Sequence, residues 1–255
     1  MSFLSAAYTD IGNSRKVNQD AFCLKTAATS KGHVALAVLC DGMGGLSNGE
    51  LASSFVVNAF SRWFREEFSS MLKAGSDFPA IQKKWESLIK LQNRKIIDYG
   101  QKNGSMGTTL SALLLLNNGY LIAQVGDSRI YKLGTALRQL TKDQSFVWQE
   151  VERGRLTPEQ ARVHPRRNEL LQSIGVSDPL EPVFTQGKTQ AGEVFLLCSD
   201  GFYHELSDNE LYGLFAPIVM SGESVMKNSL RDVTELVKRR GETDNISAVV
   251  IKQNG

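Results

Sequence analysis

Residues 34–42 read Val-Ala-Leu-Ala-Val-Leu-Cys-Asp-Gly, and residues 194–201 read Val-Phe-Leu-Leu-Cys-Ser-Asp-Gly. Each apolar run is too short for a helix and stops at an Asp-Gly pair, which predicts a buried strand. A carboxylate at the end of such a strand is held rigidly at the edge of the core, and the glycine lets a backbone carbonyl approach the same point. Two strand ends of this kind that face each other would form an all-oxygen site for a hard divalent cation. Taken singly, either Asp-Gly pair can also be an ordinary turn.

The composition indicates an ordinary globular protein. The chain has 255 residues, of which 42% are hydrophobic and 22% charged, so it can bury a sizeable core. No linker rich in Pro, Gly or Ser interrupts it, and we therefore expect a single domain over residues 1–255. The formal charge of +2, from 29 basic and 27 acidic residues, gives no bulk-charge argument for nucleic-acid binding. We expect no nucleic-acid partner.

Cysteine usage and hydropathy indicate a reducing, aqueous compartment. The three cysteines, Cys23, Cys40 and Cys198, lack metal-ligand spacing, and the last two end apolar runs, as buried reduced thiols do. No apolar run approaches the roughly 20 residues of a membrane span. Residues 1–5 do not combine a basic region with an apolar stretch, as a secretory signal does. We expect a cytoplasmic protein that has no membrane contact and is a monomer.

The order of helices and strands predicts antiparallel sheets. The first hundred residues indicate three strands and two helices, with one wide apolar face over residues 51–64 and a second helix over 78–99. The stretch 47–50 has the spacing of a capping box at the start of the first helix. Residues 108–125 form a hairpin signature in which Asn118-Gly119 supplies the positive-φ turn. Because the helices come in blocks, we expect antiparallel sheets with helices segregated outside rather than a doubly wound parallel sheet.

A polar and charged stretch, residues 141–178, interrupts the strands. It predicts short helices, one from Asp143 to Arg153 and a second that begins at Thr157 with Pro158 in its first position. We expect this stretch to be an insertion on the outside of the domain. A polar insertion and the adjacent proline favour a structural role for His164 over that of a general acid.

Aspartates stand at several strand ends and turns. One such residue indicates a turn, but five spread along the chain suggest convergence on a shared site, because a bound metal ion makes clustered carboxylates tolerable. A set of oxygen ligands without His or Cys favours Mg²⁺ or Mn²⁺ over Zn²⁺. The five residues are Asp20, Asp41, Asp127, Asp200 and Asp244.

Six short motifs follow one another along the chain. They are Arg15…Asn18-Gln19-Asp20, Asp41-Gly42-Met43-Gly44-Gly45, Gly107-Thr108-Thr109, Gly126-Asp127-Ser128-Arg129, Ser199-Asp200-Gly201 and Asp244-Asn245. Together they resemble the metal-dependent Ser/Thr protein phosphatases of the 2C type, and the resemblance covers essentially the full chain. The insertion resembles the flap of the bacterial members of that family. Its matching residues are Gly154, Thr157, His164-Pro165-Arg166-Arg167-Asn168 and Gly175.

The resemblance implies a fold and a set of residue roles. The fold is α+β, a four-layer α/β/β/α sandwich in which two antiparallel sheets are flanked by helices, with a small flap insertion over residues 141–178. Arg15 binds the phosphate with two parallel hydrogen bonds that a lysine could not reproduce. The implied metal ligands are Asp41 as the bridge between two ions, Asp20 and the Gly42 carbonyl (directly or through water) at the first, Asp200 and Asp244 at the second, and Asp127 with Asp200 at a third.

The resemblance also implies an activity, the hydrolysis of phosphoserine and phosphothreonine in proteins without a phospho-enzyme intermediate. A water that bridges two Mn²⁺ or Mg²⁺ ions is expected to attack phosphorus in line, with two to three ions in all. The implied partners are phosphorylated Ser/Thr proteins, a cognate Ser/Thr kinase among them. Two alternatives stay open. One is a catalytically silent relative that binds phosphoproteins, which the complete ligand set disfavours; the other is a phosphatase dedicated to one regulator, such as an anti-sigma antagonist.

Several positions qualify this assignment. Met43 stands where eukaryotic members carry a histidine proposed as the leaving-group acid, so a metal-bound water or another side chain must supply that proton. Gln19 stands where many relatives have Glu, which removes one acceptor for a water near an ion. Asp127 can also be a simple turn-former, and we expect Arg129 to pair with acidic residues inside the protein rather than with substrate. We expect Gly201 to serve only a turn.

Overall fold

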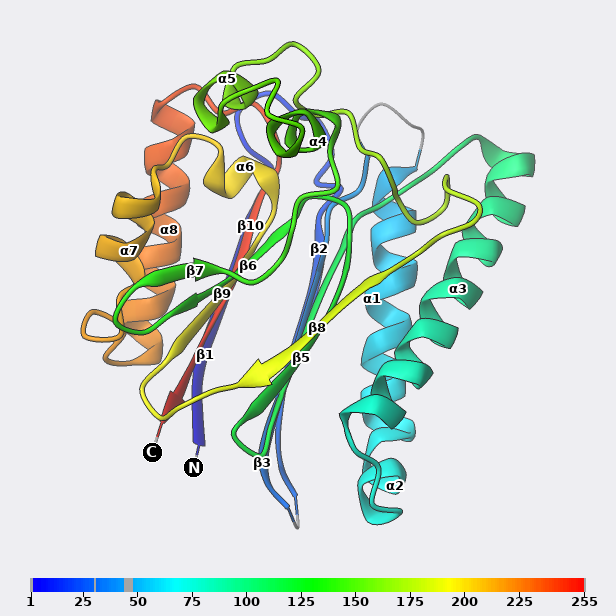
Figure 1. The fold of residues 1–255 in the computed structure, drawn as a ribbon, viewed down its shortest axis with the longest axis vertical. Coiled ribbons are helices and arrows are strands. Elements are labelled where there is room, and N and C mark those ends of the chain that lie inside the picture. The colour runs from blue at the N-terminus through cyan, green and yellow to red at the C-terminus, as the bar shows by residue number, and fades with distance from the viewer. Residues whose placement is uncertain (1, 30, 44–47, 255) are drawn as a thin grey trace.

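The computed structural model describes residues 2–29, 31–43 and 48–254 (Figure 1). Within these ranges, ten strands form two five-stranded sheets in which neighbouring strands are antiparallel. In spatial order, the first sheet consists of β1 (Ser2–Asp10), β10 (Ile246–Asn254), β9 (Val194–Cys198), β6 (Arg129–Leu133) and β7 (Leu137–Gln139). The second sheet consists of β2 (Ala21–Thr29), β3 (Gly32–Cys40), β4 (Leu110–Leu116), β5 (Gly119–Val125) and β8 (Val183–Lys188).

The two apolar runs form the inner strands β3 and β9, which are buried on both faces. Along β3, the side chains of Leu36 and Val38 belong to the core beneath the helices, whereas those of Ala37 and Leu39 belong to the core between the sheets. The side chains of β9 divide between two cores in the same way. A strand that is buried on both faces needs no polar alternation, which explains why both runs are uniformly apolar.

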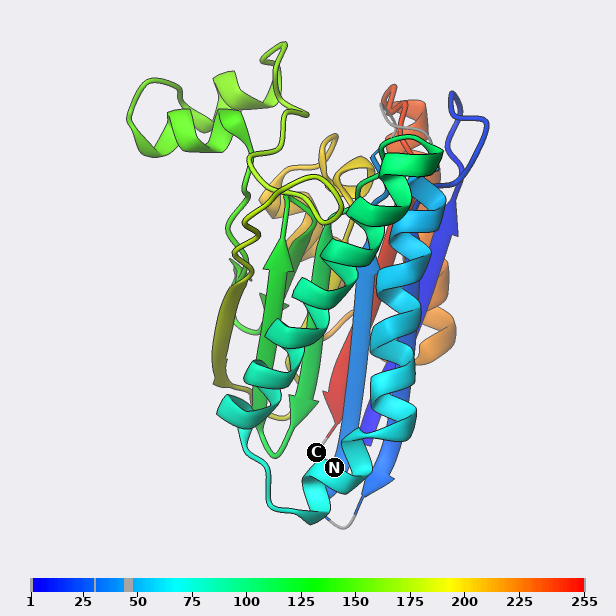
Figure 2. The same ribbon diagram turned by 90° about the vertical axis from the view of Figure 1, so that its right-hand side faces the viewer.

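Helices cover the outer face of each sheet, so that the protein has four layers (Figures 1 and 2). The outer face of the first sheet packs against α6 (Asp200–Tyr203), α7 (Asp208–Phe215) and α8 (Glu223–Arg239). The outer face of the second packs against α1 (Gly49–Glu66), α2 (Phe68–Lys73) and α3 (Phe78–Asn103). The predicted α+β fold, an α/β/β/α sandwich of two antiparallel sheets, is confirmed.

The hairpin between β4 and β5 is present, but its turn lies one residue earlier than predicted. The residues with positive φ are Asn117 (53°) and Asn118 (59°), as a type I′ turn requires. Gly119 is instead the first residue of β5 and pairs with Leu116. Glycine is needed there for space, because a Cβ would lie 2.7 Å from the ring of Phe78.

The helices of the first hundred residues differ from the prediction in two respects. The six-residue helix α2 lies between the two expected helices, where no pattern indicated one. At the start of α1, the N-cap residue Asn48 makes no hydrogen bond through its side chain. Ser47, the first residue of the expected capping box, lies outside the described residues.

The polar stretch 141–178 lies outside both sheets, above one end of the sandwich (Figures 1 and 2). It contains α4 (Phe146–Glu152) and α5 (Pro158–Arg162). The first of these begins at Phe146 rather than at the expected Asp143, because the Ser145 hydroxyl caps it. Where the stretch returns, the backbones of Thr108 and Ile174 exchange two hydrogen bonds of 3.0 and 2.9 Å and join it to the body.

One end of the sandwich gathers the loops that follow the strands of both sheets. The β1–β2 loop, the end of β3, the β5–β6 turn, the start of α6 and the α8–β10 connection all lie at the end that α4 and α5 cover (Figure 1). Both termini lie at the opposite end. Segments that are far apart in the sequence therefore meet at one place, and each of them carries one of the five aspartates.

Candidate metal centre

Asp41 is held by its backbone at the end of β3. Its N–H donates to the hydroxyl of Thr109 (2.9 Å), and its carbonyl accepts from the Thr109 N–H (2.9 Å) and the Thr108 hydroxyl (2.9 Å). The two bonds that involve hydroxyl groups explain why two threonines follow Gly107 in the third sequence motif. Since the backbone of Asp41 is fixed on both sides, its side chain projects from a rigid strand end.

Gly42 occupies a place where three segments meet. Its N–H donates to the Gln19 carbonyl (3.1 Å). A Cβ at this position would lie 2.5 Å from the carbonyl oxygen of Gly49, in the first turn of α1, and 2.6 Å from that of Gln19. Only glycine fits such a gap, so the residue brings the Asp20 loop, the end of β3 and the start of α1 together.

Asp20 lies in the β1–β2 loop beside residues of the first sheet. The Asn245 side chain accepts a hydrogen bond from the Gln19 N–H (2.9 Å), which fixes the loop against the α8–β10 connection. The Ser199 hydroxyl donates to Asp20 Oδ2 (3.0 Å). Sequence reasoning included Ser199 and Asn245 in motifs but assigned them no role; the structure shows that they position Asp20.

Asp200 is the first residue of α6, and Ser199 precedes it at the N-cap. The expectation that Gly201 serves only a turn is wrong, because Gly201 is a helical residue. A Cβ on Gly201 would collide with the carbonyl oxygen of Asn245, so this glycine lets α6 approach the connection that carries Asp244. The close approach brings Asp200 and Asp244 to the same end of the first sheet.

Arg15 lies at the same cluster and forms an ion pair with Asp244. Its Nε donates to Asp244 Oδ1 (2.9 Å) and its Nη2 to Oδ2 (2.6 Å), a two-bond fork. This hydrogen bonding is the main cause of the raised pKa of Arg15. The side chain of Arg15 remains 37% exposed, so the guanidinium lies at the surface of the cluster rather than beneath it.

Asp127 lies in the β5–β6 turn above a buried ion pair. As expected, Arg129 pairs with an internal carboxylate: its Nη2 lies 2.7 Å from Asp143 Oδ2, and its guanidinium stacks over the ring of Tyr203 at 3.8 Å. The Tyr203 hydroxyl donates to the backbone carbonyl of Asp127 (3.2 Å). Gly126 adopts a φ of 94°, which glycine tolerates, and so turns the chain just before Asp127.

Burial and mutual repulsion raise the pKa of three carboxyls in this cluster. Burial raises the pKa of Asp20 to about 7, although hydrogen bonds from serines oppose the rise. Burial also raises the pKa of Asp127, and the charge of Asp200 adds to it. The pKa of Asp41 lies well above its ordinary value because of burial first and then the charges of Asp20, Asp200, Asp244 and Asp127. Since the other four act on Asp41, the five predicted residues do converge.

Free carboxylate oxygens decide whether a divalent cation fits this cluster. Asp20 Oδ1 and Asp200 Oδ1 are buried and have no hydrogen-bond partner among the described residues. Such oxygens are costly unless a cation neutralises them. Among the described residues, no three His, Cys, Asp or Glu side chains already lie in positions that could hold a metal ion. At Asp244, both carboxylate oxygens accept hydrogen bonds from Arg15. The donor set consists of oxygens alone and fits Mg²⁺ or Mn²⁺.

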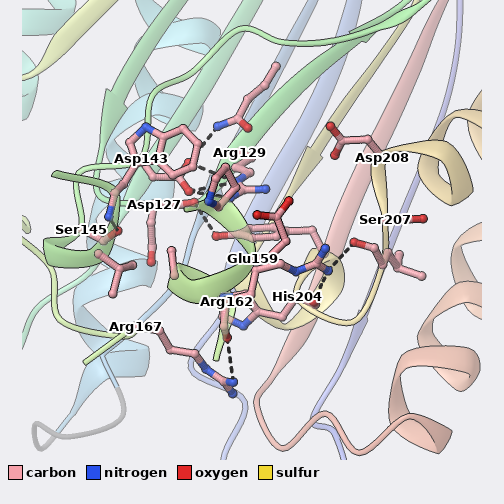
Figure 3. Close-up of a pocket in the computed structure, with 17 residues that line it drawn as sticks. Asp127, Arg129, Asp143, Ser145, Glu159, Arg162, Arg167, His204, Ser207 and Asp208 are labelled. Carbon is pink, nitrogen blue, oxygen red and sulfur yellow. Dashed lines mark hydrogen bonds and ion pairs between the residues drawn. The ribbon is translucent and has the colours of Figure 1, made fainter. Parts of the chain in front are cut away.

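A cavity of about 360 Å³ opens beside Asp127, between α4–α5 and α6–α7 (Figure 3). Asp127 and Arg129 line it from the body, and Arg162 and His204 lie side by side at its edge. Sequence reasoning did not predict this cavity, since its two walls come from segments that no motif connects. Of the five aspartates, Asp127 alone lines this cavity, which therefore borders the cluster on the side of the insertion.

The described geometry corresponds to that of known metal-dependent phosphatases. A sequence profile described as protein phosphatase 2C matches residues 12–238. A solved structure of a serine/threonine phosphatase from Streptococcus agalactiae superposes with a TM-score of 0.83 at 32% identity, and the match covers 99% of this chain and 100% of that one. The chain belongs to the protein phosphatase 2C family of metal-dependent protein phosphatases.

Two further relatives refine the comparison. The serine/threonine phosphatase stp of Listeria welshimeri is 31% identical over 96% of this chain and 94% of its own length. The catalytic domain of the serine/threonine protein phosphatase PstP, solved in complex with two manganese ions, superposes with a TM-score of 0.79 at 31% identity and covers 100% of this chain and 99% of that one. The protein is accordingly a Ser/Thr protein phosphatase of the bacterial type.

Proposed function

We propose that the chain hydrolyses phosphoserine and phosphothreonine in proteins at a binuclear Mn²⁺ or Mg²⁺ centre built around Asp41. Four other carboxylates act on the carboxyl of Asp41, which is partly buried, and this convergence carries the proposal. Like charges gather in this way where cations hold them together. The PstP catalytic domain with its two manganese ions supports the choice of ions.

The carboxylates divide between the ions according to the segments that carry them. Asp41 would bridge the two ions from the end of β3. Asp20 and the Gly42 carbonyl would complete the first site, since the Gly42 N–H bonds to the loop of Asp20. Asp200 and Asp244 would hold the second. Asp127 with Asp200 would hold a third ion, so that two to three ions bind in all.

The ions, when bound, supply the positive charge that acidifies the attacking water and offsets the charge of the phosphate. Arg15 presents the phosphate, because the fork that it forms on the two Asp244 oxygens also matches two oxygens of a phosphate. Cys40 and Cys198 are completely buried in apolar cores, and burial raises the pKa of the Cys40 thiol. They are unsuited to act as nucleophiles, in agreement with hydrolysis that forms no phospho-enzyme. Met43 has a thioether side chain and cannot protonate the leaving group.

The partners would be phosphorylated Ser/Thr proteins, a cognate Ser/Thr kinase among them. The stretch 141–178 would be a flap within one phosphatase domain, residues 1–255, and the cavity beneath it would take the substrate chain next to the phosphate. A monomer in the cytoplasm, without nucleic-acid or membrane partners, is the form that we propose. None of the helices in the described ranges has the length and apolar character of a membrane span.

The test measures phosphate release from a phosphothreonine peptide with Mn²⁺ and with a chelator. We expect release that depends on Mn²⁺ and that Asp41→Ala abolishes. Peptide binding without release would indicate the catalytically silent relative instead. Turnover of a single regulatory phosphoprotein, with none of unrelated phosphopeptides, would indicate the dedicated phosphatase. Release that persists unchanged in the chelator would contradict the metal centre.

A further inference from the structure

Glu242 has a buried carboxylate, and the two oxygens of this group differ in their hydrogen bonding. Its side chain is 3% exposed. Oε1 accepts hydrogen bonds from the backbone N–H groups of Thr243 (2.7 Å) and Asp244 (2.9 Å). Oε2 has no hydrogen-bond partner among the described residues. Glu242 thus orients the backbone of Asp244 with one oxygen, while the other faces into the interior beside the carboxylate cluster.

His204 faces that second oxygen from α6. Its Nδ1 lies 3.8 Å from Glu242 Oε2 and 3.9 Å from Asp200 Oδ2. The ring is mostly buried and packs edge-on against Tyr203, with a centroid separation of 5.0 Å. Asp200 and Glu242 are two buried carboxylates that repel each other, and Nδ1 of His204 lies near both, where an N–H would offset that repulsion.

The backbone of His204 connects this pair to the insertion. Arg162 of α5 donates through Nη2 to the carbonyl oxygens of His204 and Leu206, both at 2.6 Å. Figure 3 shows Arg162 and His204 side by side at the edge of the cavity. The His204 N–H donates to the Asp200 carbonyl (3.0 Å) and closes the single turn of α6. One residue therefore contacts the insertion, the helix of Asp200 and the carboxylate behind Asp244.

We propose that Glu242 and His204 are positioning residues that hold Asp200 and Asp244 at the separation that binds the second ion, a role that rests on the metal centre proposed above. Asp200 comes from α6 and Asp244 from the α8–β10 connection. Because the two residues lie on different segments, the local structure of neither segment sets the distance between their carboxylates. Glu242 holds Asp244 through its N–H group. His204, one helical turn beyond Asp200, lies between Asp200 and Glu242 and so links the two segments. Groups that orient metal ligands in this way typically contribute about 10–100-fold to metal affinity.

The experiment titrates Mn²⁺ into the purified full-length protein and follows free Mn²⁺ by electron paramagnetic resonance. His204→Leu removes the donor between the carboxylates and should weaken the binding of one ion by roughly 10–100-fold. His204→Gln, whose amide N–H can lie in the same place, should restore most of the affinity. A purely electrostatic effect has the opposite sign, because loss of the donor leaves the site more negative and Mn²⁺ would bind more tightly.

Glu193→Gln is a matched control. Glu193 is also a largely buried carboxylate that accepts a backbone N–H, from Gln190 (2.9 Å), and pairs with Lys132 (3.0 Å), but it precedes β9 at the end opposite to Asp200. We expect it to leave Mn²⁺ binding unchanged. Thermal unfolding of each variant in chelator shows whether the fold is retained.

The outcomes separate the two proposals. Mn²⁺ binding by His204→Leu that equals or exceeds that of the wild type overturns the positioning role and leaves the metal centre intact. A wild-type protein that binds no Mn²⁺ overturns both. If His204→Leu does not fold, Glu242→Gln decides in its place, because it keeps the shape of the side chain and carries the same expected loss.

Discussion

The two Asp-Gly pairs look alike in the sequence, but the structure supports them by different means. Asp41 directly follows β3, and hydrogen bonds with Thr108 and Thr109, which directly precede the neighbouring strand β4, hold its backbone. Asp200 begins the helix α6, and its carbonyl accepts the helical hydrogen bond from the His204 N–H. One carboxylate is therefore fixed by a contact between segments that are far apart in the sequence, and the other by a local turn of helix.

The two glycines share a purpose that a turn does not explain. At Gly42 a side chain would meet the backbone of Gly49 and Gln19, and at Gly201 it would meet the backbone of Asn245. In both places glycine permits another ligand-bearing segment to approach. The comparison teaches that in each Asp-Gly pair the aspartate supplies a ligand, and the glycine leaves space for another ligand-bearing segment. This holds both after a strand and at the start of a helix.

Asn substitutions at the two aspartates should have the largest effects. Asp41→Asn weakens both ions of the proposed centre, so the rate should fall by roughly 10³-fold or more, at or beyond the range for removing one group that stabilises a transition-state charge. Asp200→Asn weakens the second ion and the third but leaves the first. Counting bound Mn²⁺ by electron paramagnetic resonance, with phosphate release measured in parallel, checks this difference. An Asp41→Asn variant that keeps a larger share of the rate than Asp200→Asn would refute the bridging role of Asp41.

pH should change the stability of the metal-free protein by a few kcal/mol. Burial raises the pKa of Asp20 to about 7 in the folded protein, against about 4 in the unfolded chain. Between these values the folded state binds more protons, so the free energy of unfolding falls as the pH rises from about 4 to about 7, by about 1.4 kcal/mol for each pKa unit. Thermal melts in chelator should show the decline, and Asp20→Asn should make it shallower, since the raised pKa values of Asp41 and Asp127 contribute the rest. An increase in stability over this window would contradict the prediction.

Alanine at either glycine should cost about 1–3 kcal/mol, because each added methyl overpacks against a backbone carbonyl that cannot rotate away. At Gly201 the preference of helices for Ala over Gly, about 1 kcal/mol, offsets part of that cost, so Gly42→Ala should be the more destabilising. Urea unfolding in chelator measures both. Gly213→Ala in α7 is the matched control, since a Cβ there meets nothing within 4 Å, and it should be neutral or stabilising. A stabilised Gly201→Ala would mean that α6 can move away from Asn245.

Much of the fold could be predicted because its signals lie within short stretches. The strands β3 and β9 are uniformly apolar since both faces are buried, and the five aspartates are recognisable because each stands where an element begins or ends. The helix α2 could not be predicted, because six residues are too few to show a helical period.

The partners of the site residues could not be predicted, because they come from distant segments. Arg15 and Asp244 form their fork across 229 positions of the sequence. His204 and Glu242 are ordinary polar residues in their own surroundings, and only the approach of α6 to the α8–β10 connection brings them together. A pattern of residue types does not predict which distant segments come into contact.

Removal of the Thr109 or the Ser199 hydroxyl should have the smallest effects. The change in Mn²⁺ binding should differ between the two variants. Thr109 Oγ1 accepts the Asp41 N–H and shares a hydrogen bond with Ser128 (2.7 Å), so Thr109→Val should cost about 1–2 kcal/mol of stability. Mn²⁺ affinity should hardly change, because the Asp41 carbonyl keeps both of its hydrogen-bond donors after the hydroxyl of Thr109 is lost.

Ser199→Ala should cost a similar amount of stability, because its hydroxyl accepts the Ser247 N–H (3.0 Å), but unlike Thr109→Val it should also weaken Mn²⁺ binding. The Ser199 hydroxyl donates to Asp20 Oδ2, and this bond favours the charged carboxylate, so its loss lets protons compete better with Mn²⁺. Urea unfolding and Mn²⁺ titration on the same two variants make the check. If Thr109→Val weakened Mn²⁺ binding more than Ser199→Ala did, the backbone of Asp41 would depend on the single Thr109 hydroxyl, and the rigid strand end would not be the feature that presents its carboxylate.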